Sequence, residues 1–109
     1  PNATISSVMH IVKIRKLNRA IGETLKLLYN HRCQICGENI SARYGVHIVE
    51  THQLEPFVVS FNNNADNQII ICPNHHRIIH KAKPVFDRKN LRFVYHNGIE
   101  ENIVLNQHL

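Results

Sequence analysis

The chain has 109 residues, with thirteen lysines and arginines against eight aspartates and glutamates, which gives a formal net charge of +5 at pH 7. This length supports one modest hydrophobic core, and no apolar run approaches the roughly eighteen residues of a membrane span. The first residues lack the basic and apolar regions of a signal peptide. We therefore expect a single soluble, cytoplasmic domain, not a membrane protein, and the basic charge favours a polyanionic partner such as nucleic acid.

An amphipathic helix is predicted over residues 11–28. Apolar residues recur there at steps of three and four, at Ile11, Ile14, Leu17, Ile21, Leu25 and Leu28. Lysines and arginines fall mostly between them, so the helix has an apolar face and a basic outer face. That outer face is suited to phosphate contact, although a solvated surface explains such charges more often.

A ββα unit is predicted in the middle of the chain. Residues 45–54 are rich in β-branched side chains, as expected of a strand. A polar loop over 62–67 leads to a short buried strand over 68–71. Pro73 then suits the first position of a helix of about ten residues that ends before Pro84.

The C-terminal region is predicted to form a β-hairpin. Asn97-Gly98 lies between the apolar runs 91–95 and 99–105, and Asn-Gly in that setting is a strong hairpin signal. The hairpin is suited either to extending the sheet or to a homodimer contact, and the sequence leaves both open.

Four cysteine and histidine residues have the spacing of a structural zinc site. Two residues separate Cys33 from Cys36, and two separate Cys72 from His75. Turns of this kind present both side chains on one side, which suits tetrahedral coordination of zinc by sulfur and nitrogen. The odd number of cysteines also favours metal ligation over a disulfide framework in a reducing compartment. The alternative is that Cys33 and Cys36 are simply buried and that Cys72 and His75 are unrelated to them. In that case the same two-residue separation would have to occur twice by chance.

Three histidines form a second candidate metal site, at His52, His76 and His80. Residues four apart share a helix face, so His76 and His80 can bind one ion, while adjacent His75 points about 100° away, toward the zinc. Imidazole suits zinc, nickel, cobalt or manganese better than magnesium, and the identity of the ion stays open among these metals. The alternative is that His80 is only a surface residue, because the lysines near it indicate a solvated helix end.

The predicted fold is one small, zinc-stabilised α+β domain over residues 1–109. It comprises an N-terminal helix (1–29), a core of zinc knuckles and the ββα unit (30–83), and a C-terminal hairpin (84–109). Because the first residue is proline and not methionine, we expect the chain to be part of a longer protein, with a further domain upstream.

Parts of this core resemble the motif of the HNH, or ββα-metal, endonucleases. They are the segment 52–56 (His-Gln-Leu-Glu-Pro), Asn67, and the segment 72–77 (Cys-Pro-Asn-His-His-Arg). The likeness is greatest to restriction-type members that carry zinc knuckles, and it covers residues 30–81. It implies a ββα-metal fold and hydrolysis of a DNA phosphodiester by water, with one divalent ion at the scissile phosphate.

The resemblance also assigns roles to individual residues. His52 matches the first ligand of the catalytic ion, and His76 and His80 match its ligands on the helix. Asn67 matches the residue that fixes the loop between the strands and orients the general base. The family's zinc knuckles are matched by Cys33, Cys36, Cys72 and His75, where His75 replaces the more usual cysteine.

Gln53 stands where the family places the histidine that deprotonates water. A glutamine amide can hydrogen-bond a water molecule but has no useful basicity near neutral pH, so we expect cleavage to be about 10²- to 10⁴-fold slower than in a Gln53→His form. His47 is too distant to replace the base, about 20 Å away along an extended segment. A natural member that has lost its base and a deliberately disabled variant are both compatible with this sequence.

These features predict a metal-dependent DNA endonuclease domain. We expect it to be the cleavage module of a restriction or other defence nuclease that acts on double-stranded DNA, with a recognition domain upstream. Arg77 is suited to grip a phosphate through its bidentate fork, although helix solubility is a competing explanation. The alternatives are a zinc-stabilised DNA-binding module without cleavage and, with less support, a zinc domain for protein contacts. The second, all-histidine site favours the nuclease.

Overall fold

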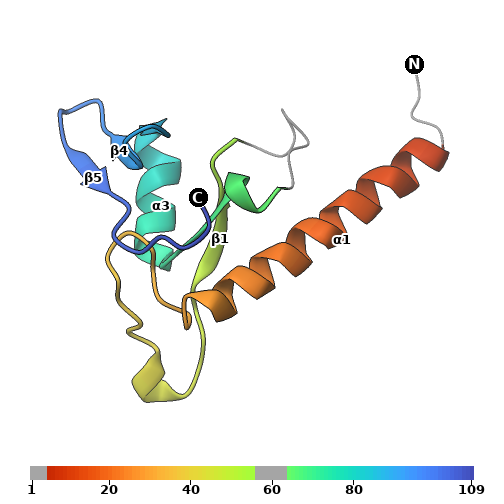
Figure 1. Ribbon diagram of the computed structural model, residues 1–109, viewed down its shortest axis with the longest axis horizontal. Coiled ribbons are helices and arrows are strands. Elements are labelled where there is room, and N and C mark those ends of the chain that lie inside the picture. The colour runs from red at the N-terminus through yellow and green to blue at the C-terminus, as the bar shows by residue number, and fades with distance from the viewer. Residues whose placement is uncertain (1–4, 56–63) are drawn as a thin grey trace.

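The computed structural model describes residues 5–55 and 64–109 (Figure 1). Within these residues it has two α-helices, α1 (Ile5–Leu28) and α3 (Pro73–Ala82). Neither helix is long and apolar enough to cross a membrane. Two parts of the predictions lie outside the described residues. They are Pro56, the last residue of the motif segment 52–56, and residues 62 and 63, the first of the predicted polar loop.

The strands form two antiparallel sheets, which confirms the predicted α+β class. The first sheet pairs β1 (Glu50–Gln53) with β2 (Gln68–Ile71), and the second has the order β3-β4-β5. The strands of the second sheet are β3 (Val85–Asp87), β4 (Arg92–Val94) and β5 (Glu100–Asn102). Two 3₁₀ turns complete the described elements, η1 (Ala42–Tyr44) and η2 (Ala65–Asn67).

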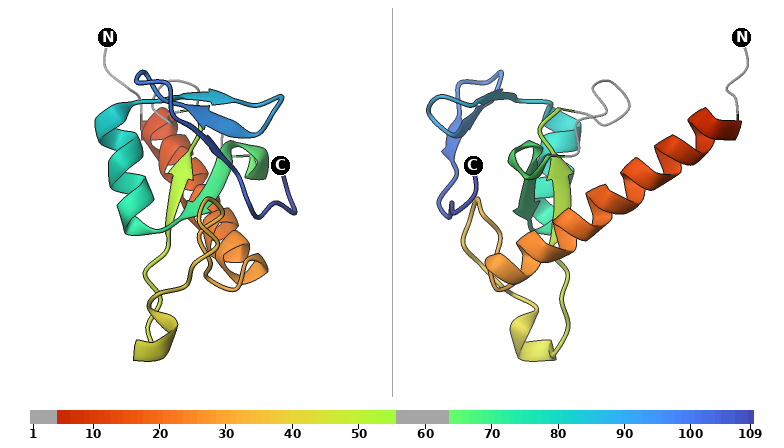
Figure 2. Two further views of the ribbon diagram at one scale, coloured as in Figure 1. Left: turned by 90° about the vertical axis from the view of Figure 1, so that its left-hand side faces the viewer. Right: turned by 45° about the vertical axis from the view of Figure 1, so that its right-hand side comes forward.

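Strand β2 forms the centre of the molecule because its two faces are both covered. Ile69 and Ile71 pack with Ile79 of α3 and Phe93 of β4, whereas Ile70 packs on the opposite side. Successive side chains of a strand point to opposite faces, so a run of three isoleucines is buried from both sides. Figure 1 and the right panel of Figure 2 accordingly show α1 and α3 on opposite sides of the first sheet.

Helix α1 packs against the sheet only with its C-terminal part. Leu25 and Tyr29, just after the helix, are buried with Val49 and Ile70. At Gly22 the helix approaches the sheet so closely that an added Cβ would lie 2.7 Å from Oγ1 of Thr51. The small side chain of glycine therefore sets the distance between helix and sheet.

The N-terminal turns of α1 extend beyond both sheets (Figures 1 and 2). The helix begins at Ile5, six residues before the predicted start. Leu17 and Leu28, both assigned to the buried apolar face, are 53% and 40% exposed. The predicted apolar face is therefore not covered by the sheet at these two positions.

Strand β1 is shorter than the strand predicted over residues 45–54. Its first residue, Glu50, pairs with Ile71, which is the last residue of β2. Cys72 then begins the turn into α3, so residues before Glu50 have no partner strand on this side. Val46 and Ile48 consequently stay exposed in spite of their high β-propensity.

Helix α3 has the predicted bounds, and local chemistry explains both ends. Cys72 is the N-cap, its sulfur accepts a hydrogen bond from the backbone N–H of His75, and Pro73 follows at the first helical position. At the other end Lys83 adopts a left-handed conformation with φ of 49° and donates its backbone N–H to the carbonyl of Ile79.

The predicted hairpin forms between β4 and β5, with Phe93 opposite Glu101. Tyr95 donates its backbone N–H to Ile99, and Gly98 at φ of 94° closes the turn. No sequence pattern indicated β3, which pairs with β4 as a third strand. Beyond β5 the chain leaves the sheet, where the prediction had continued the strand to residue 105.

Gln34 joins three parts of the fold from a fully buried position. Its side-chain oxygen accepts the N–H of Ile70 at 2.7 Å, and its amide donates to the carbonyl of Leu105 at 3.1 Å. Its own carbonyl accepts the N–H groups of Val104 and Leu105. One side chain thus connects the segment between Cys33 and Cys36 to β2 and to the C-terminal segment.

Replacement of Gln34 by alanine is expected to lower the free energy of unfolding by about 2–4 kcal/mol, because a buried N–H and a carbonyl lose their partners. Urea unfolding at a fixed zinc concentration measures this change. The matched control is Gln107→Ala at an exposed position, for which we expect a change within about 0.5 kcal/mol. Equal unfolding midpoints for the two variants would contradict the bridging role.

Candidate metal centres

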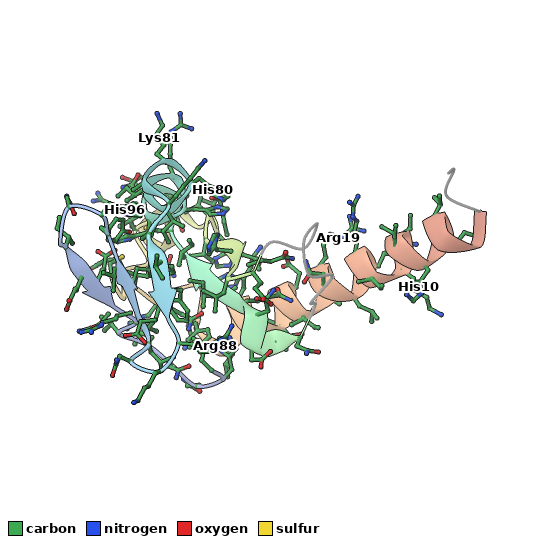
Figure 3. The ribbon with its side chains drawn as sticks, turned by 90° about the horizontal axis from the view of Figure 1, so that it is seen from above. His10, Arg19, His80, Lys81, Arg88 and His96 are labelled. Carbon is green, nitrogen blue, oxygen red and sulfur yellow. The ribbon has the colours of Figure 1, made fainter. Side chains whose placement is uncertain are left out.

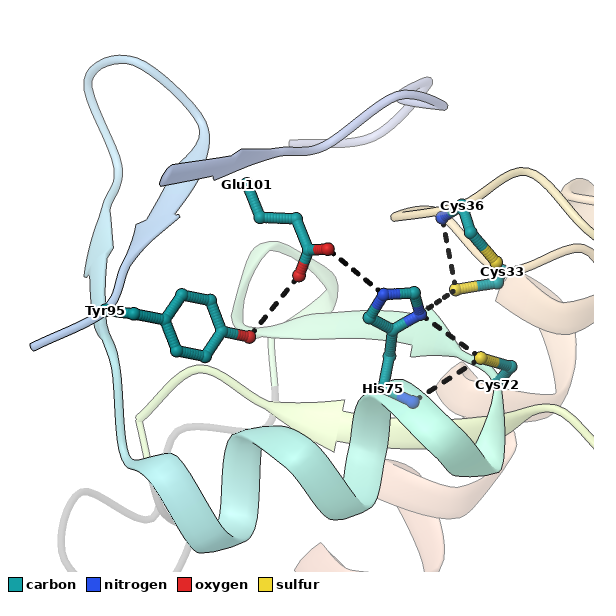
Figure 4. A network of polar contacts seen from close by, with 6 residues as sticks. All are labelled: Cys33, Cys36, Cys72, His75, Tyr95 and Glu101. Atoms are coloured by element: carbon teal, nitrogen blue, oxygen red, sulfur yellow. Dashed lines mark hydrogen bonds and ion pairs between the residues drawn. The ribbon is translucent and has the colours of Figure 1, made fainter. Parts of the chain in front are cut away.

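The first candidate centre gathers Cys33, Cys36, Cys72 and His75 (Figure 4). One ligand atom of each side chain lies within 4.8 Å of those of the others. Nδ1 of His75 faces the sulfurs of Cys72 and Cys33 at 3.3 and 3.8 Å. Three sulfurs and one nitrogen that converge in this way fit tetrahedral zinc. The group could hold a metal ion and is compatible with the predicted structural zinc.

Backbone hydrogen bonds shape the first knuckle, which is the turn from Cys33 to Cys36. Cys33 accepts the N–H of Gly37 through its carbonyl at 2.7 Å, and its sulfur accepts the N–H of Cys36 at 3.5 Å. Gly37 has φ of 74°, a conformation that glycine adopts without the cost imposed by a Cβ. The tight turn therefore directs both cysteine side chains to one point.

The two knuckles come from distant parts of the chain and differ in exposure. Cys33 is fully buried, Cys72 is half-buried and Cys36 is exposed. Burial raises the pKa of the Cys33 and Cys72 thiols above the ordinary value. Without metal these two side chains therefore favour the thiol form, and metal binding releases their protons.

The second candidate centre gathers His52 of β1 with His76 and His80 of α3. Their ligand atoms also lie within 4.8 Å of one another. The Nε2 atoms of His76 and His80 are 3.0 Å apart, and the ring of His52 has its centroid 5.5 Å from each of the other two. Spacing by four residues on α3 thus places two imidazoles against one from the sheet, as expected from helical geometry.

The surroundings of His52 favour its neutral imidazole, which is the form that binds a metal ion. Burial lowers the pKa of His52 to about 4, and the neighbouring His76 and His80 rings add to the effect. A neutral imidazole offers a free lone pair, so His52 can bind a metal ion throughout the physiological pH range. His80 is exposed, which leaves the centre open to solvent on that side.

Two adjacent histidines use opposite ring nitrogens for the two centres. Nδ1 of His75 faces the thiols, whereas Nε2 of His76 faces His80. In each ring the other nitrogen contacts a carboxylate. His76 Nδ1 lies 2.9 Å from Glu50, and His75 Nε2 lies 3.2 Å from Glu101. Neither carboxylate was predicted as part of a site, although Glu50 stands two residues before His52, on the same side of β1.

Asn67 holds the chain just after Gln53. Its side-chain oxygen accepts the N–H of Glu55 at 2.8 Å, and its amide donates to the carbonyl of Glu55 at 2.9 Å. Leu54 also donates its N–H to the Asn67 carbonyl. Gln53 itself is the last residue of β1, half-buried opposite Gln68. Asn67 thus holds the two residues that follow β1 against the residue that precedes β2.

The remaining predicted residues lie outside the two centres. Arg77 is exposed on α3, where it lines a shallow surface hollow with Lys81. His47 stacks on His31 with ring centroids 3.6 Å apart, near the end of α1 and not beside Gln53.

His108, next to the last residue of the chain, makes contacts in the interior of the fold. Its ring is half-buried, with Nδ1 hydrogen-bonded to the Tyr29 hydroxyl and Nε2 2.7 Å from the carbonyl of Gln68. It therefore ties the C-terminus to α1 and β2. The sequence carried no signal for this contact, because its partners are 79 and 40 residues away.

Comparison of the chain with protein-family models, with curated proteins and with solved structures finds no match.

Proposed function

We propose that this chain is a metal-dependent DNA endonuclease domain of the HNH type, in which the general base is replaced by glutamine. The observation that carries the proposal is the convergence of His52, His76 and His80, separate from the cysteine-rich group. A domain that needed metal only for folding would have no use for a second, solvent-open set of ligands. The reaction class, hydrolysis of a phosphodiester, comes from the resemblance of segments 52–56 and 72–77, together with Asn67, to the HNH motif.

Each part of the site has a task in this proposal. A divalent ion held by the three histidines would stabilise negative charge on the phosphoryl group and the leaving oxygen. Glu50 orients the ring of His76 through Nδ1 and leaves Nε2 for the ion. Gln53 hydrogen-bonds the attacking water, and Asn67 fixes the backbone that follows Gln53. The chain therefore binds and orients the reactants but lacks efficient proton removal.

Double-stranded DNA is the proposed substrate because the chain is basic and because two exposed basic residues lie on the helix that carries the histidines. The chain has a formal net charge of +5, and the exposed Arg77 and Lys81 lie on α3, the helix that carries two of the three histidines. Arginine can bind phosphate in a bidentate manner, so these residues can contact the DNA backbone from the same helix, on a neighbouring face. We further propose that recognition of a particular sequence depends on a domain upstream.

A second candidate is a DNA-binding module that no longer cleaves, and the identity of Gln53 is the observation that favours it. Slow, metal-dependent nicking by the chain as it stands separates the two. Supercoiled plasmid incubated for long times with manganese, cobalt or nickel should be nicked by this chain, and His76→Ala should abolish the nicking. The control is His10→Ala, whose exposed ring lies on α1 far from His80 (Figure 3). If this chain and His76→Ala both bind DNA and neither of them nicks it, the result supports the binding module.

A further inference from the structure

Glu101 lies on β5 and contacts the first candidate centre from the second sheet. Its Oε2 is 3.2 Å from Nε2 of His75, and this side of the His75 ring is opposite to Nδ1, which faces the sulfurs. Glu101 and His75 are both largely shielded, with side chains 33% and 17% exposed. A carboxylate in this position accepts the Nε2–H of a neutral imidazole and leaves Nδ1 without a proton.

Tyr95 holds the carboxylate from its other oxygen. Its hydroxyl donates to Oε1 of Glu101 at 3.3 Å (Figure 4). Burial and the adjacent Glu101 carboxylate raise the pKa of Tyr95 to about 12, so the hydroxyl stays protonated and can donate at neutral pH. The result is a continuous chain from the hairpin through Tyr95, Glu101 and His75 to the cysteine sulfurs.

We propose that Glu101 is a positioning residue for the structural zinc, which fixes His75 in the tautomer that ligates through Nδ1 and thereby joins the second sheet to the metal centre. The proposal rests on the zinc site of the proposed function but not on nuclease activity. It also explains why a histidine can stand at the fourth knuckle position. A cysteine needs no tautomer choice, whereas a histidine there gains a partner on β5 that sets its ring orientation.

The neighbouring residue on the same strand provides a matched control. Glu100 is exposed and pairs with Arg92 at 2.9 Å, away from the cysteine cluster. Removal of either carboxylate changes the net charge of β5 equally. Any difference in zinc binding between Glu101→Ala and Glu100→Ala therefore reports the contact with His75 and not the charge of the strand.

The experiment uses the zinc-loaded chain with ¹⁵N-labelled histidine and a zinc-chelator competition. We expect the original chain to show a protonated Nε2 and a metal-bound Nδ1 for His75. Glu101→Ala should weaken zinc binding about 10- to 100-fold and shift the His75 nitrogen signals, whereas Glu100→Ala should do neither. Glu101→Gln keeps an acceptor oxygen and should lose less affinity than Glu101→Ala.

Two results would overturn the proposal. One is an equal zinc affinity and equal His75 signals in Glu101→Ala and Glu100→Ala, and the other is zinc bound to His75 through Nε2 in the original chain. Failure of the zinc site itself gives a different result, in which Cys33→Ser and the original chain compete equally poorly with the chelator. A general loss of hairpin structure is detected separately, because the amide signals of β4 and β5 then change in dispersion.

Discussion

Replacement of Gln53 by histidine is expected to raise the rate of plasmid cleavage by about 10²- to 10⁴-fold, the usual contribution of a positioned general base. Gln53 follows His52 directly in β1, and Asn67 clamps the backbone at Glu55 just beyond it. In the proposed function, a histidine at position 53 would therefore supply the missing base on a segment that is already fixed. Its imidazole can accept a proton from water near neutral pH, which a glutamine amide cannot do.

The measurement compares initial cleavage rates with magnesium, manganese, cobalt and nickel supplied one at a time. Gln53→Ala provides the matched control, because it removes the amide without adding a base and should not gain activity. Adding His76→Ala to the Gln53→His form should remove the gain, since the ion loses a ligand. A Gln53→His form no faster than the original chain with any of these ions would show that the role assigned to position 53 is wrong.

Local spacing was sufficient to predict the ligand groups. The two residues between Cys33 and Cys36, and the spacing of four positions from His76 to His80 along a helix, fix which side chains can share an ion. The burial of 68–71 on both faces and the start of α3 at Pro73 also follow from short-range signals. These parts of the fold depend on neighbouring residues, so the sequence alone indicates them.

The residues that the sequence did not indicate act through distant partners. Glu101 and His75 are 26 residues apart, as are Glu50 and His76, and Gln34 binds Ile70 from 36 residues away. No periodicity or motif joins such pairs in one sequence. Their partners become known only when the sheets and α3 are placed together.

The predicted strands differ from the observed ones for a related reason. The β-branched residues before Glu50 favour a strand, but pairing stops where β2 reaches Cys72 and turns into α3. Conversely, Val85–Asp87 is too short to show an alternating pattern, yet it pairs with β4. Whether a segment forms a strand depends on an available edge, and a single sequence does not contain that information directly.

Removal of zinc from the cysteine-rich centre is expected to unfold the domain. Structural zinc in small domains contributes about 10–16 kcal/mol of apparent binding free energy, which equals or exceeds the roughly 5–15 kcal/mol that stabilises a typical domain. Cys33 is fully buried in the same cluster as Ile69, Ile71 and Phe93, so loss of the metal removes the bonds between the cysteine and histidine side chains beside the core. Thermal scans should lose their cooperative transition after chelation or in Cys33→Ser.

The second centre supplies the contrast that makes this prediction specific to the cysteine-rich group. His80 is exposed at the other face of α3, so His80→Ala should weaken binding of the second ion and leave the thermal transition nearly unchanged. Metal analysis should then find about one tightly held zinc per chain in His80→Ala and none in Cys33→Ser. A chelated chain that keeps a cooperative transition near its original temperature would contradict a structural role, because the core would then hold the knuckles together without metal.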